Sequence, residues 1–170
     1  MFSITLATIA AAKPKKKWRN SLAKAEKSNL DIVWSAGGPD LGWLVENYIE
    51  DKSEKKYAGP SLKTLMALIS EFSRGQNLMI GTAMLDGKPI AAILILIHGK
   101  SATYQIGYSG KVGREKCAHH LLLWDALRKL KERQVNDFDL GGINEEGAKG
   151  VRDFKIGMGG EVFESPGLWA

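Results

Sequence analysis

The sequence predicts an α+β protein in which helices flank a mixed, largely antiparallel sheet. First, three apolar segments separated by short turns follow one another within residues 78–108, which is typical of a β-meander. Second, amphipathic segments with helical spacing lie before and after this meander. Third, 44% of the 170 residues are hydrophobic, which is enough for the core of a single domain spanning residues 1–170.

Three helices and a strand are expected before the meander, from the spacing of apolar residues and from residues typical of helix ends. They are a helix over 18–27, a strand over 30–35, a helix over 41–51 with Asp40 as its cap, and a helix that begins at Pro60 or Ser61 and closes at Gly75. Their predicted inner faces are Trp18, Leu22 and Ala25; Leu44, Val45, Tyr48 and Ile49; and Leu62, Leu65, Leu68, Ile69 and Phe72.

The strands of the meander are predicted over residues 78–85, 89–97 and 102–108, with Asp86-Gly87 as a tight turn. The middle strand is apolar at every position from Ile90 to Ile97, so both of its faces should be covered. The elements expected to follow are a loop over 110–114, a helix with Leu123, Leu127, Leu130 and Trp124 facing inward, and a strand over 137–140.

The first segment, residues 2–12, resembles a signal peptide only superficially. Its basic cluster, Lys13 to Arg19, follows the apolar run, whereas a signal peptide begins with its basic residues. We therefore expect an edge strand or a short element there. Cys117 is the only cysteine, which excludes an internal disulfide and favours a reducing cytoplasm. No apolar run approaches the ~20 residues that cross a bilayer, so no membrane span is expected.

Glycines and one lysine near the end of the chain predict a site for an oxygen that gains negative charge. Phe138-Asp139-Leu140 runs into Gly141-Gly142, where the backbone can turn sharply and lie close to a ligand. Phe154-Lys155 follows, shortly before Gly159-Gly160. A fixed cation among exposed main-chain N–H groups suits a reacting acyl or phosphoryl oxygen. Asp139 or Glu145 could serve as the general base.

Six motifs together resemble the C-terminal acyltransferase domain of the Fem family, bacterial enzymes that attach amino acids to peptidoglycan precursors. They are Lys17-Trp18-Arg19-Asn20, Gly87-Lys88-Pro89-Ile90-Ala91-Ala92, Ala102 to Tyr108, Leu121-Leu122-Leu123-Trp124, Phe138 to Gly142, and Phe154-Lys155 with Gly159-Gly160. The order of the expected elements also matches the GNAT acyltransferase fold, an analogy that concerns the fold alone.

The resemblance implies a reaction and a set of site residues. An acceptor amine on a UDP-linked muramyl peptide would attack the ester of an aminoacyl-tRNA and form an amide. Lys155 would stabilise the reacting oxygen, and Phe154 would form a wall of the site. The residues expected to bind substrate are Arg19, Tyr104, Gly141, Gly142, Gly159 and Gly160.

Two departures from the Fem pattern are present. Full Fem transferases pair two GNAT-like domains, whereas this chain has room for one, so a homodimer could substitute for the missing half. Met158 also stands where an aromatic residue is usual.

No cofactor is predicted. In GNAT enzymes that use acetyl-CoA, a (Gln/Arg)-x-x-Gly-x-(Gly/Ala) loop at a helix N-terminus holds the pyrophosphate. Here Gly110 stands three residues before Gly113 in place of Gln or Arg, and Glu115 would repel a pyrophosphate. Two alternatives stay open: an acetyl- or acyl-CoA-dependent N-acyltransferase, and a non-catalytic domain that binds a precursor or RNA.

Metal chemistry is not expected, because the adjacent His119 and His120 point about 100° apart on a helix and no acidic or cysteine ligand completes a site. The net charge of +5 is compatible with a polyanionic partner such as tRNA or a nucleotide-linked precursor. The basic residues between 13 and 27 could follow phosphates, although a solvated helix face is the favoured explanation.

Overall fold

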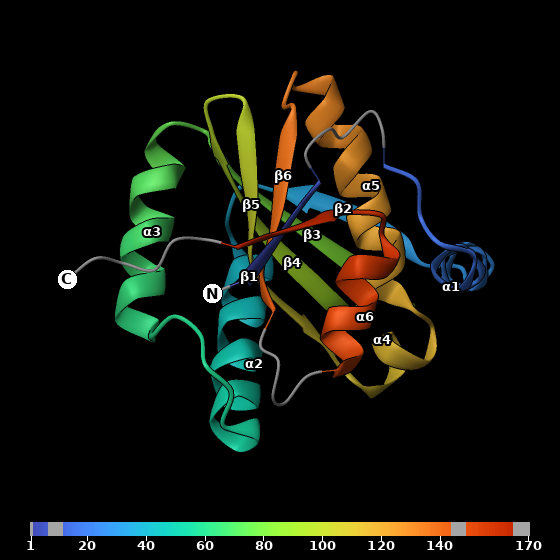
Figure 1. Ribbon diagram of the computed structural model, residues 1–170. Helices are drawn as coiled ribbons and strands as arrows, with labels where there is room; N and C mark the ends of the chain where they lie inside the picture. The colour runs from blue at the N-terminus through green and yellow to red at the C-terminus, as the bar shows by residue number, and fades with distance from the viewer. Residues whose placement is uncertain (1, 7–11, 144–148, 165–170) are drawn as a thin grey trace.

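The computed structural model describes residues 2–6, 12–143 and 149–164, which form a seven-stranded sheet flanked by helices (Figure 1). The strand order is β2-β3-β4-β5-β6-β1-β7, and all neighbours are antiparallel except β5 and β6. The predicted α+β class is confirmed. The strands are β1 Phe2–Leu6, β2 Asp31–Ser35, β3 Leu78–Leu85, β4 Lys88–His98, β5 Ser101–Ser109, β6 Asp137–Ile143 and β7 Glu161–Glu164. The helices are α1 Lys16–Glu26, α2 Pro39–Lys55, α3 Leu62–Arg74, α4 Lys111–Glu115, α5 Ala118–Glu132 and α6 Lys149–Gly157.

Helices cover both faces of the sheet, with α2 and α3 on one side and α1, α5 and α6 on the other (Figure 1). Consecutive side chains of a strand point to opposite faces. Along β4, Ile93 and Ile95 pack in the core beneath α5, whereas Leu94 and Leu96 pack in the core beneath α2 and α3. The prediction that both faces of this strand are covered is therefore confirmed.

The predicted inner faces of the helices are confirmed with one exception. Ser61 caps α3, since its hydroxyl accepts a hydrogen bond from the Thr64 N–H at 3.1 Å, and Gly75 is the C-cap. Leu62, however, is 49% exposed. It lies one turn before Met66, which is 50% exposed, and both side chains belong to the outward face of α3.

Two expectations about the first part of the chain are wrong. Residues 2–6 form an interior strand, because β7 pairs along the side of β1 that β6 leaves open. The remainder of that predicted element, residues 7–11, lies outside the described residues. Asp40 does not cap α2: Gly38 is the N-cap, no side chain caps this end, and Asp40 lies in the first turn. Its charge is still favourable there because the helix N-terminus is electropositive.

The expected loop over 110–114 is also wrong, because these residues form the short helix α4. Cys117, with a left-handed φ of 56°, separates α4 from α5. The inward stripe of α5 is confirmed: Leu123, Leu127 and Leu130 are buried, Leu122 and Ala126 join them, and Trp124 packs against the same core.

A bulge in β5 reverses the direction of its side chains. Leu94 pairs with Ile106 and Ile95 with Tyr104, so Gln105 is the extra residue. Tyr104 consequently packs in the core beneath α5, whereas Tyr108 packs in the core beneath α2 and α3.

The parallel pair β5 and β6 is joined only at one end. The pairing extends from Ser101–Asp137 to Thr103–Asp139, after which β6 continues beside β1. Within the described residues, β5 beyond Thr103 therefore has no strand partner on this side. The parting of the two strands positions the candidate site.

Candidate functional site

Lys155 projects from α6 to the strand end that contains the two glycines. Its ammonium donates a hydrogen bond to the Gly142 carbonyl at 3.0 Å. Burial lowers the pKa of Lys155 from its ordinary value, and the negative charge of Asp139 opposes this effect. The structure thus brings together three residues that the sequence singled out, with the lysine partly buried.

Asp139 stabilises the turn at this strand end. Its Oδ1 accepts a hydrogen bond from the Gly141 N–H at 2.8 Å. Gly141 has a φ of +79°, a left-handed conformation that favours glycine. Asp139 therefore has a local structural role, and its role as a general base stays a prediction.

Tyr104 lies on the other side of the parting strands. Its ring centre is 6.0 Å from the Lys155 nitrogen, at the limit for a cation–π contact. A Cβ placed on Gly141 would be 3.7 Å from both the Lys155 nitrogen and the Tyr104 carbonyl oxygen. Tyr104, Gly141, Gly142 and Lys155 therefore share one small region where β5 and β6 separate.

Phe154 forms an aromatic wall beside Lys155. Its ring packs edge-on against His120, with ring centres 4.7 Å apart, and against His119 at 6.3 Å. Trp18 of α1 completes the cluster, at 5.0 Å from His120 and 6.2 Å from Phe154. Phe154 thus has the surroundings expected of a wall of the site, and its contact with substrate stays a prediction.

His119 is a site residue that sequence reasoning missed. Its Nε2 lies 3.5 Å from the Tyr104 hydroxyl. Burial, with a smaller effect of His120, lowers the pKa of His119 to about 4, so the ring is neutral near neutral pH. The pair His119-His120 was visible in the sequence, but only the tertiary structure shows which of the two faces Tyr104.

Two of the remaining predicted residues, Arg19 and Gly159, contact the segment before α1. Arg19 donates to the Pro14 carbonyl at 3.3 Å. Gly159 has a φ of +92°, and a Cβ there would be 2.6 Å from the Lys13 carbonyl oxygen. Gly160 follows it and leads into β7. The packing of Gly159 on Lys13, with the hydrogen bond from the Lys15 N–H to the Gly157 carbonyl, joins this segment to the end of α6. Binding of substrate by Arg19, Gly159 and Gly160 stays a prediction.

The start of α4 contains the loop in which a coenzyme A site was sought, and two of its polar groups are used within the fold. The Gly110 N–H donates to the Ile90 carbonyl at 3.0 Å. The Arg114 guanidinium donates to the Ser109 carbonyl at 2.6 Å. A Cβ on Gly113 would be 2.5 Å from both the Ile90 oxygen and the Ser109 hydroxyl. Gly113 is therefore needed for packing against β4.

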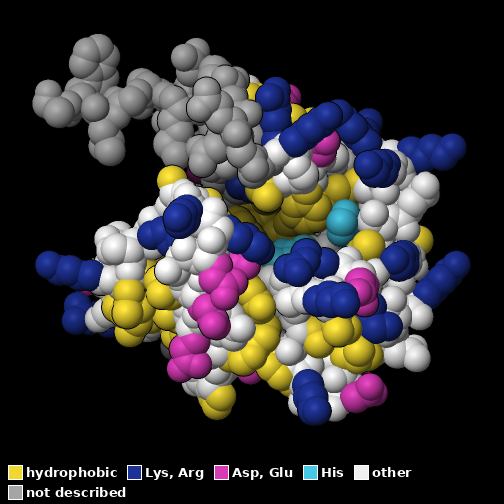
Figure 2. Space-filling model, turned by 90° about the horizontal axis from the view of Figure 1, so that it is seen from below, with side chains coloured by type: hydrophobic (Ala, Val, Ile, Leu, Met, Phe, Trp, Pro, Cys, Tyr) yellow, Lys and Arg dark blue, Asp and Glu magenta, His cyan; other side chains and the backbone are white. Residues whose placement is uncertain are grey.

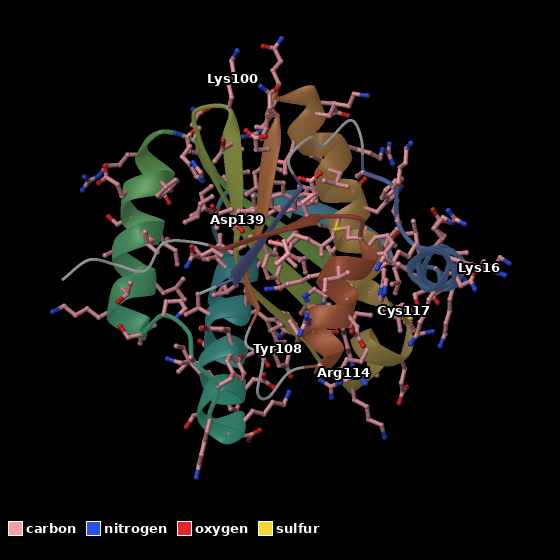
Figure 3. The ribbon with its side chains drawn as sticks, in the orientation of Figure 1. Lys16, Lys100, Tyr108, Arg114, Cys117 and Asp139 are labelled. Carbon is pink, nitrogen blue, oxygen red and sulfur yellow. The ribbon has the colours of Figure 1, made fainter. Side chains whose placement is uncertain are left out.

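The face of the molecule seen from below has a hollow lined by hydrophobic and histidine side chains, with Lys and Arg around it (Figure 2). Figure 3 shows Tyr108 and Arg114 near the lower end of the sheet and Asp139 near its middle. Lys100 lies at the opposite end. His119, His120 and Phe154 are each partly exposed.

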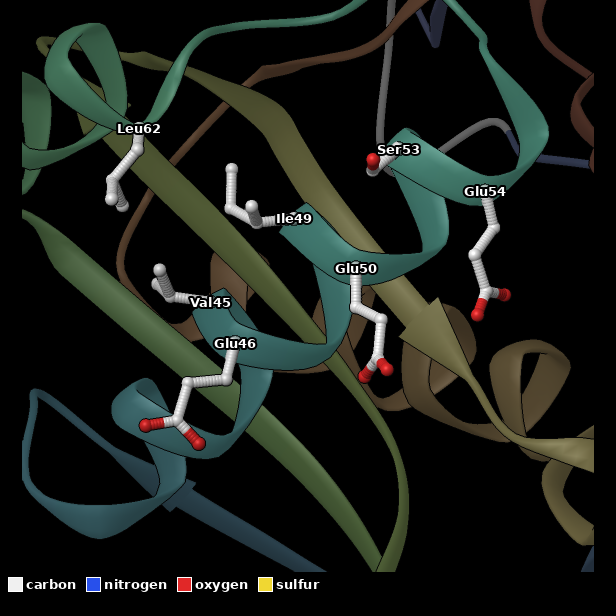
Figure 4. A pocket seen from close by; sticks show the side chains of 7 residues that line it. All are labelled: Val45, Glu46, Ile49, Glu50, Ser53, Glu54 and Leu62. Carbon is white, nitrogen blue, oxygen red and sulfur yellow. The ribbon is translucent and has the colours of Figure 1, made fainter.

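A second depression lies beside α2, between this helix and the start of α3 (Figure 4). Val45, Ile49 and Leu62 supply its apolar surface, and an acidic row, Glu46, Glu50 and Glu54, runs along its side. We call this depression the α2 groove.

Two other features were sought. Within residues 2–6, 12–143 and 149–164, no group of three or more His, Cys, Asp or Glu side chains could hold a metal ion. In the same part of the chain, no helix is both long and apolar enough to cross a membrane.

The α+β fold has a sheet that parts between two parallel strands, with a short helix after the first. The family profile of the acetyltransferase (GNAT) domain matches residues 12–160. The chain belongs to this family and is a GNAT acyltransferase domain. No similar sequence was found among curated proteins.

Solved structures share the fold at low sequence identity. FemX superposes with a TM-score of 0.79 at 9% identity, over 95% of this chain and 59% of FemX. The C-terminal domain of a putative lysylphosphatidylglycerol synthetase from Agrobacterium fabrum has a TM-score of 0.67 at 16% identity, over 94% of this chain and 56% of the other. A predicted acetyltransferase with acetyl-CoA from Clostridium acetobutylicum has a TM-score of 0.57 at 15% identity, over 83% of this chain and 94% of that one. The chain thus spans under two thirds of the first two.

Proposed function

We propose that this domain transfers an aminoacyl group from aminoacyl-tRNA to an amine of a UDP-linked muramyl peptide. The observation that carries the proposal is the position of Lys155, whose ammonium donates to the Gly142 carbonyl at 3.0 Å where β5 and β6 part. An ammonium has three N–H donors. Within the described residues, one is used for this hydrogen bond and two remain for the carbonyl oxygen of an ester.

The chemistry follows from this placement. The neutral acceptor amine attacks the ester carbonyl carbon, and the carbonyl oxygen becomes negative. Lys155 stabilises this oxygen, and its partial burial makes the attraction stronger than it is in water. Phe154 and the histidines of α5 exclude water from one side of the reacting group.

Two comparisons support aminoacyl transfer as the reaction class. FemX shares the fold over nearly the whole chain, and the motifs around Phe154-Lys155 resemble the Fem family. A second neighbour is, by its name, a putative lysylphosphatidylglycerol synthetase, so its product carries an aminoacyl group. A homodimer, with a second copy in place of the second Fem domain, is part of the same proposal.

The family description and the neighbour with acetyl-CoA favour one alternative, an acyl-CoA-dependent N-acyltransferase. The internal hydrogen bonds of Gly110 and Arg114 weigh against it.

A donor comparison tests the proposal. The purified protein is incubated with UDP-linked muramyl pentapeptide and either radiolabelled aminoacyl-tRNA or radiolabelled acetyl-CoA, and label in the peptide is measured. We expect transfer from tRNA only, and thermal stabilisation by the precursor of about 2.7 kcal/mol at one hundred times its Kd. Transfer from acetyl-CoA alone establishes the alternative. Binding of precursor or RNA without transfer from either donor indicates a non-catalytic domain.

A further inference from the structure

We propose that Tyr104 and His119 form a proton relay in this site, an inference that rests on the proposed aminoacyl transfer. Tyr104 is the group that meets the substrate, and His119 is a positioning residue that acts through the Tyr104 hydroxyl. The two come from different elements, β5 and α5, and their polar atoms are 3.5 Å apart.

The backbone of β5 creates the space for this pair. The bulge at Gln105 places Gly107 on the same face as Tyr104, although their numbers differ by three. A Cβ on Gly107 would lie 2.8 Å from His119 Nε2 and in collision with the Tyr104 hydroxyl. A side chain at position 107 would therefore require Tyr104 or His119 to move from its observed position.

The relay lies beside the cation that holds the reacting oxygen. The Lys155 nitrogen is 6.0 Å from the centre of the Tyr104 ring. An ester whose carbonyl oxygen is bound by Lys155 thus lies within reach of the Tyr104 side chain. Tyr104 and His119 are both partly exposed, so a ligand can reach this wall of the site.

His119 has the protonation state that the relay needs. It is surrounded by Tyr104, by the ring of Phe154 and by its neighbour His120, with no acidic side chain in contact within the described residues. Its burial disfavours the imidazolium, as the pKa of about 4 indicates. A neutral imidazole can accept a proton for a moment and return it.

The proposed steps balance. The amine nitrogen forms a bond to the ester carbonyl carbon, and the carbonyl π electrons move to the oxygen held by Lys155. Tyr104 takes a proton from that nitrogen while its own proton passes to His119 Nε2. The ester C–O bond then breaks, the leaving alkoxide takes a proton from Tyr104, and His119 returns its proton to Tyr104.

Three variants and two donors test the relay. Tyr104→Phe removes the hydroxyl and keeps the ring, and His119→Gln keeps a hydrogen-bond acceptor but cannot bind a proton. Lys155→Ala reports on the oxygen site. Each is assayed with aminoacyl-tRNA and with an aminoacyl ester of a more acidic alcohol, whose departure needs no proton. Circular dichroism and melting temperature verify folding.

We expect Tyr104→Phe and His119→Gln to lower kcat about 100-fold with aminoacyl-tRNA, at nearly unchanged KM. The loss should shrink with the activated ester, whereas Lys155→Ala should be impaired with both donors. Full kcat in a folded His119→Gln variant, or an equal loss with both donors, overturns the relay alone. Absence of transfer by the unaltered protein overturns the proposed function and the relay together.

Gly107→Ala supplies an independent test, because its methyl group separates Tyr104 from His119 without removing either. The matched control is Gly42→Ala in α2, where an added Cβ meets nothing within 4 Å. We expect Gly107→Ala to reproduce the donor-dependent loss and the control to retain transfer. A folded Gly107→Ala variant with full kcat contradicts the relay.

Discussion

The region where β5 and β6 separate, which we call the Lys155 site, and the α2 groove differ in how their polar residues are held. In the groove, Glu46, Glu50 and Glu54 follow one another at four-residue spacing on a single helix, and all are exposed. In the Lys155 site, the lysine and the histidines come from α6 and α5, are partly buried, and contact a strand end and an aromatic wall.

The difference teaches which polar side chains indicate chemistry. Exposed carboxylates in a row are solvated, and their proximity needs no compensation from the fold. A partly buried ammonium or imidazole loses hydration, so its surroundings must offset the loss. Within the described part of the chain, Lys155 obtains this compensation from the Gly142 carbonyl and the charge of Asp139.

The largest expected difference between the two regions is in aminoacyl transfer. We expect Lys155→Ala to lower kcat/KM about 100-fold or more, because it removes the donor aimed at the developing oxyanion. Glu50→Gln in the α2 groove is the comparison variant, and we expect it to retain activity. Equal rates in a folded Lys155→Ala variant would remove Lys155 from the mechanism.

Acid should destabilise the fold by protonating His119 and His120. Burial lowers the pKa of His119 and His120 from 6.5 to about 4, so the native state binds fewer protons than the unfolded chain between these values. The free energy of unfolding is therefore expected to fall as pH drops from 6.5 to 4, by on the order of 2 kcal/mol for each histidine. Urea titrations at several pH values measure it.

The matched control is His98→Asn at an exposed strand end. We expect this variant to retain the pH dependence of stability. The double variant His119→Gln, His120→Gln should lose most of it. If the free energy of unfolding of the double variant depends on pH as before, His119 and His120 are excluded as the cause.

A smaller effect is expected at the strand end that receives Lys155. Gly141→Ala imposes a side chain on a left-handed residue with a φ of +79°, at a cost of about 1–2 kcal/mol. It also places a methyl group near the Lys155 nitrogen, so transfer should fall too. Gly150→Ala, whose added Cβ meets nothing within 4 Å, is the control. Unchanged stability and transfer would show that this turn tolerates alanine.

The smallest effect concerns the side of the molecule that carries the α2 groove. Ser61→Ala removes the hydroxyl that accepts the Thr64 N–H and should destabilise the fold by about 1 kcal/mol with no loss of transfer. Ser70→Ala, at an exposed position within α3, is the control. Loss of transfer without loss of stability would instead connect α3 to the site.

The sequence by itself predicted the fold class, the meander, the covered central strand and most inner faces of the helices. These features depend on local periodicity and on turn and cap residues, which neighbouring positions determine. It also placed Lys155 near the Gly141-Gly142 strand end. The part taken by each residue there in transfer stays a prediction.

Only the tertiary structure decided the remainder. β1 became an interior strand because β7, from the far end of the chain, pairs with it. The bulge at Gln105 placed Tyr104 beside Gly107 and His119. The backbone of Gly159 packs against Lys13, a contact that the sequence did not predict. Each outcome depends on pairings between residues distant in the chain, and local periodicity contains no information about which distant backbone will lie alongside.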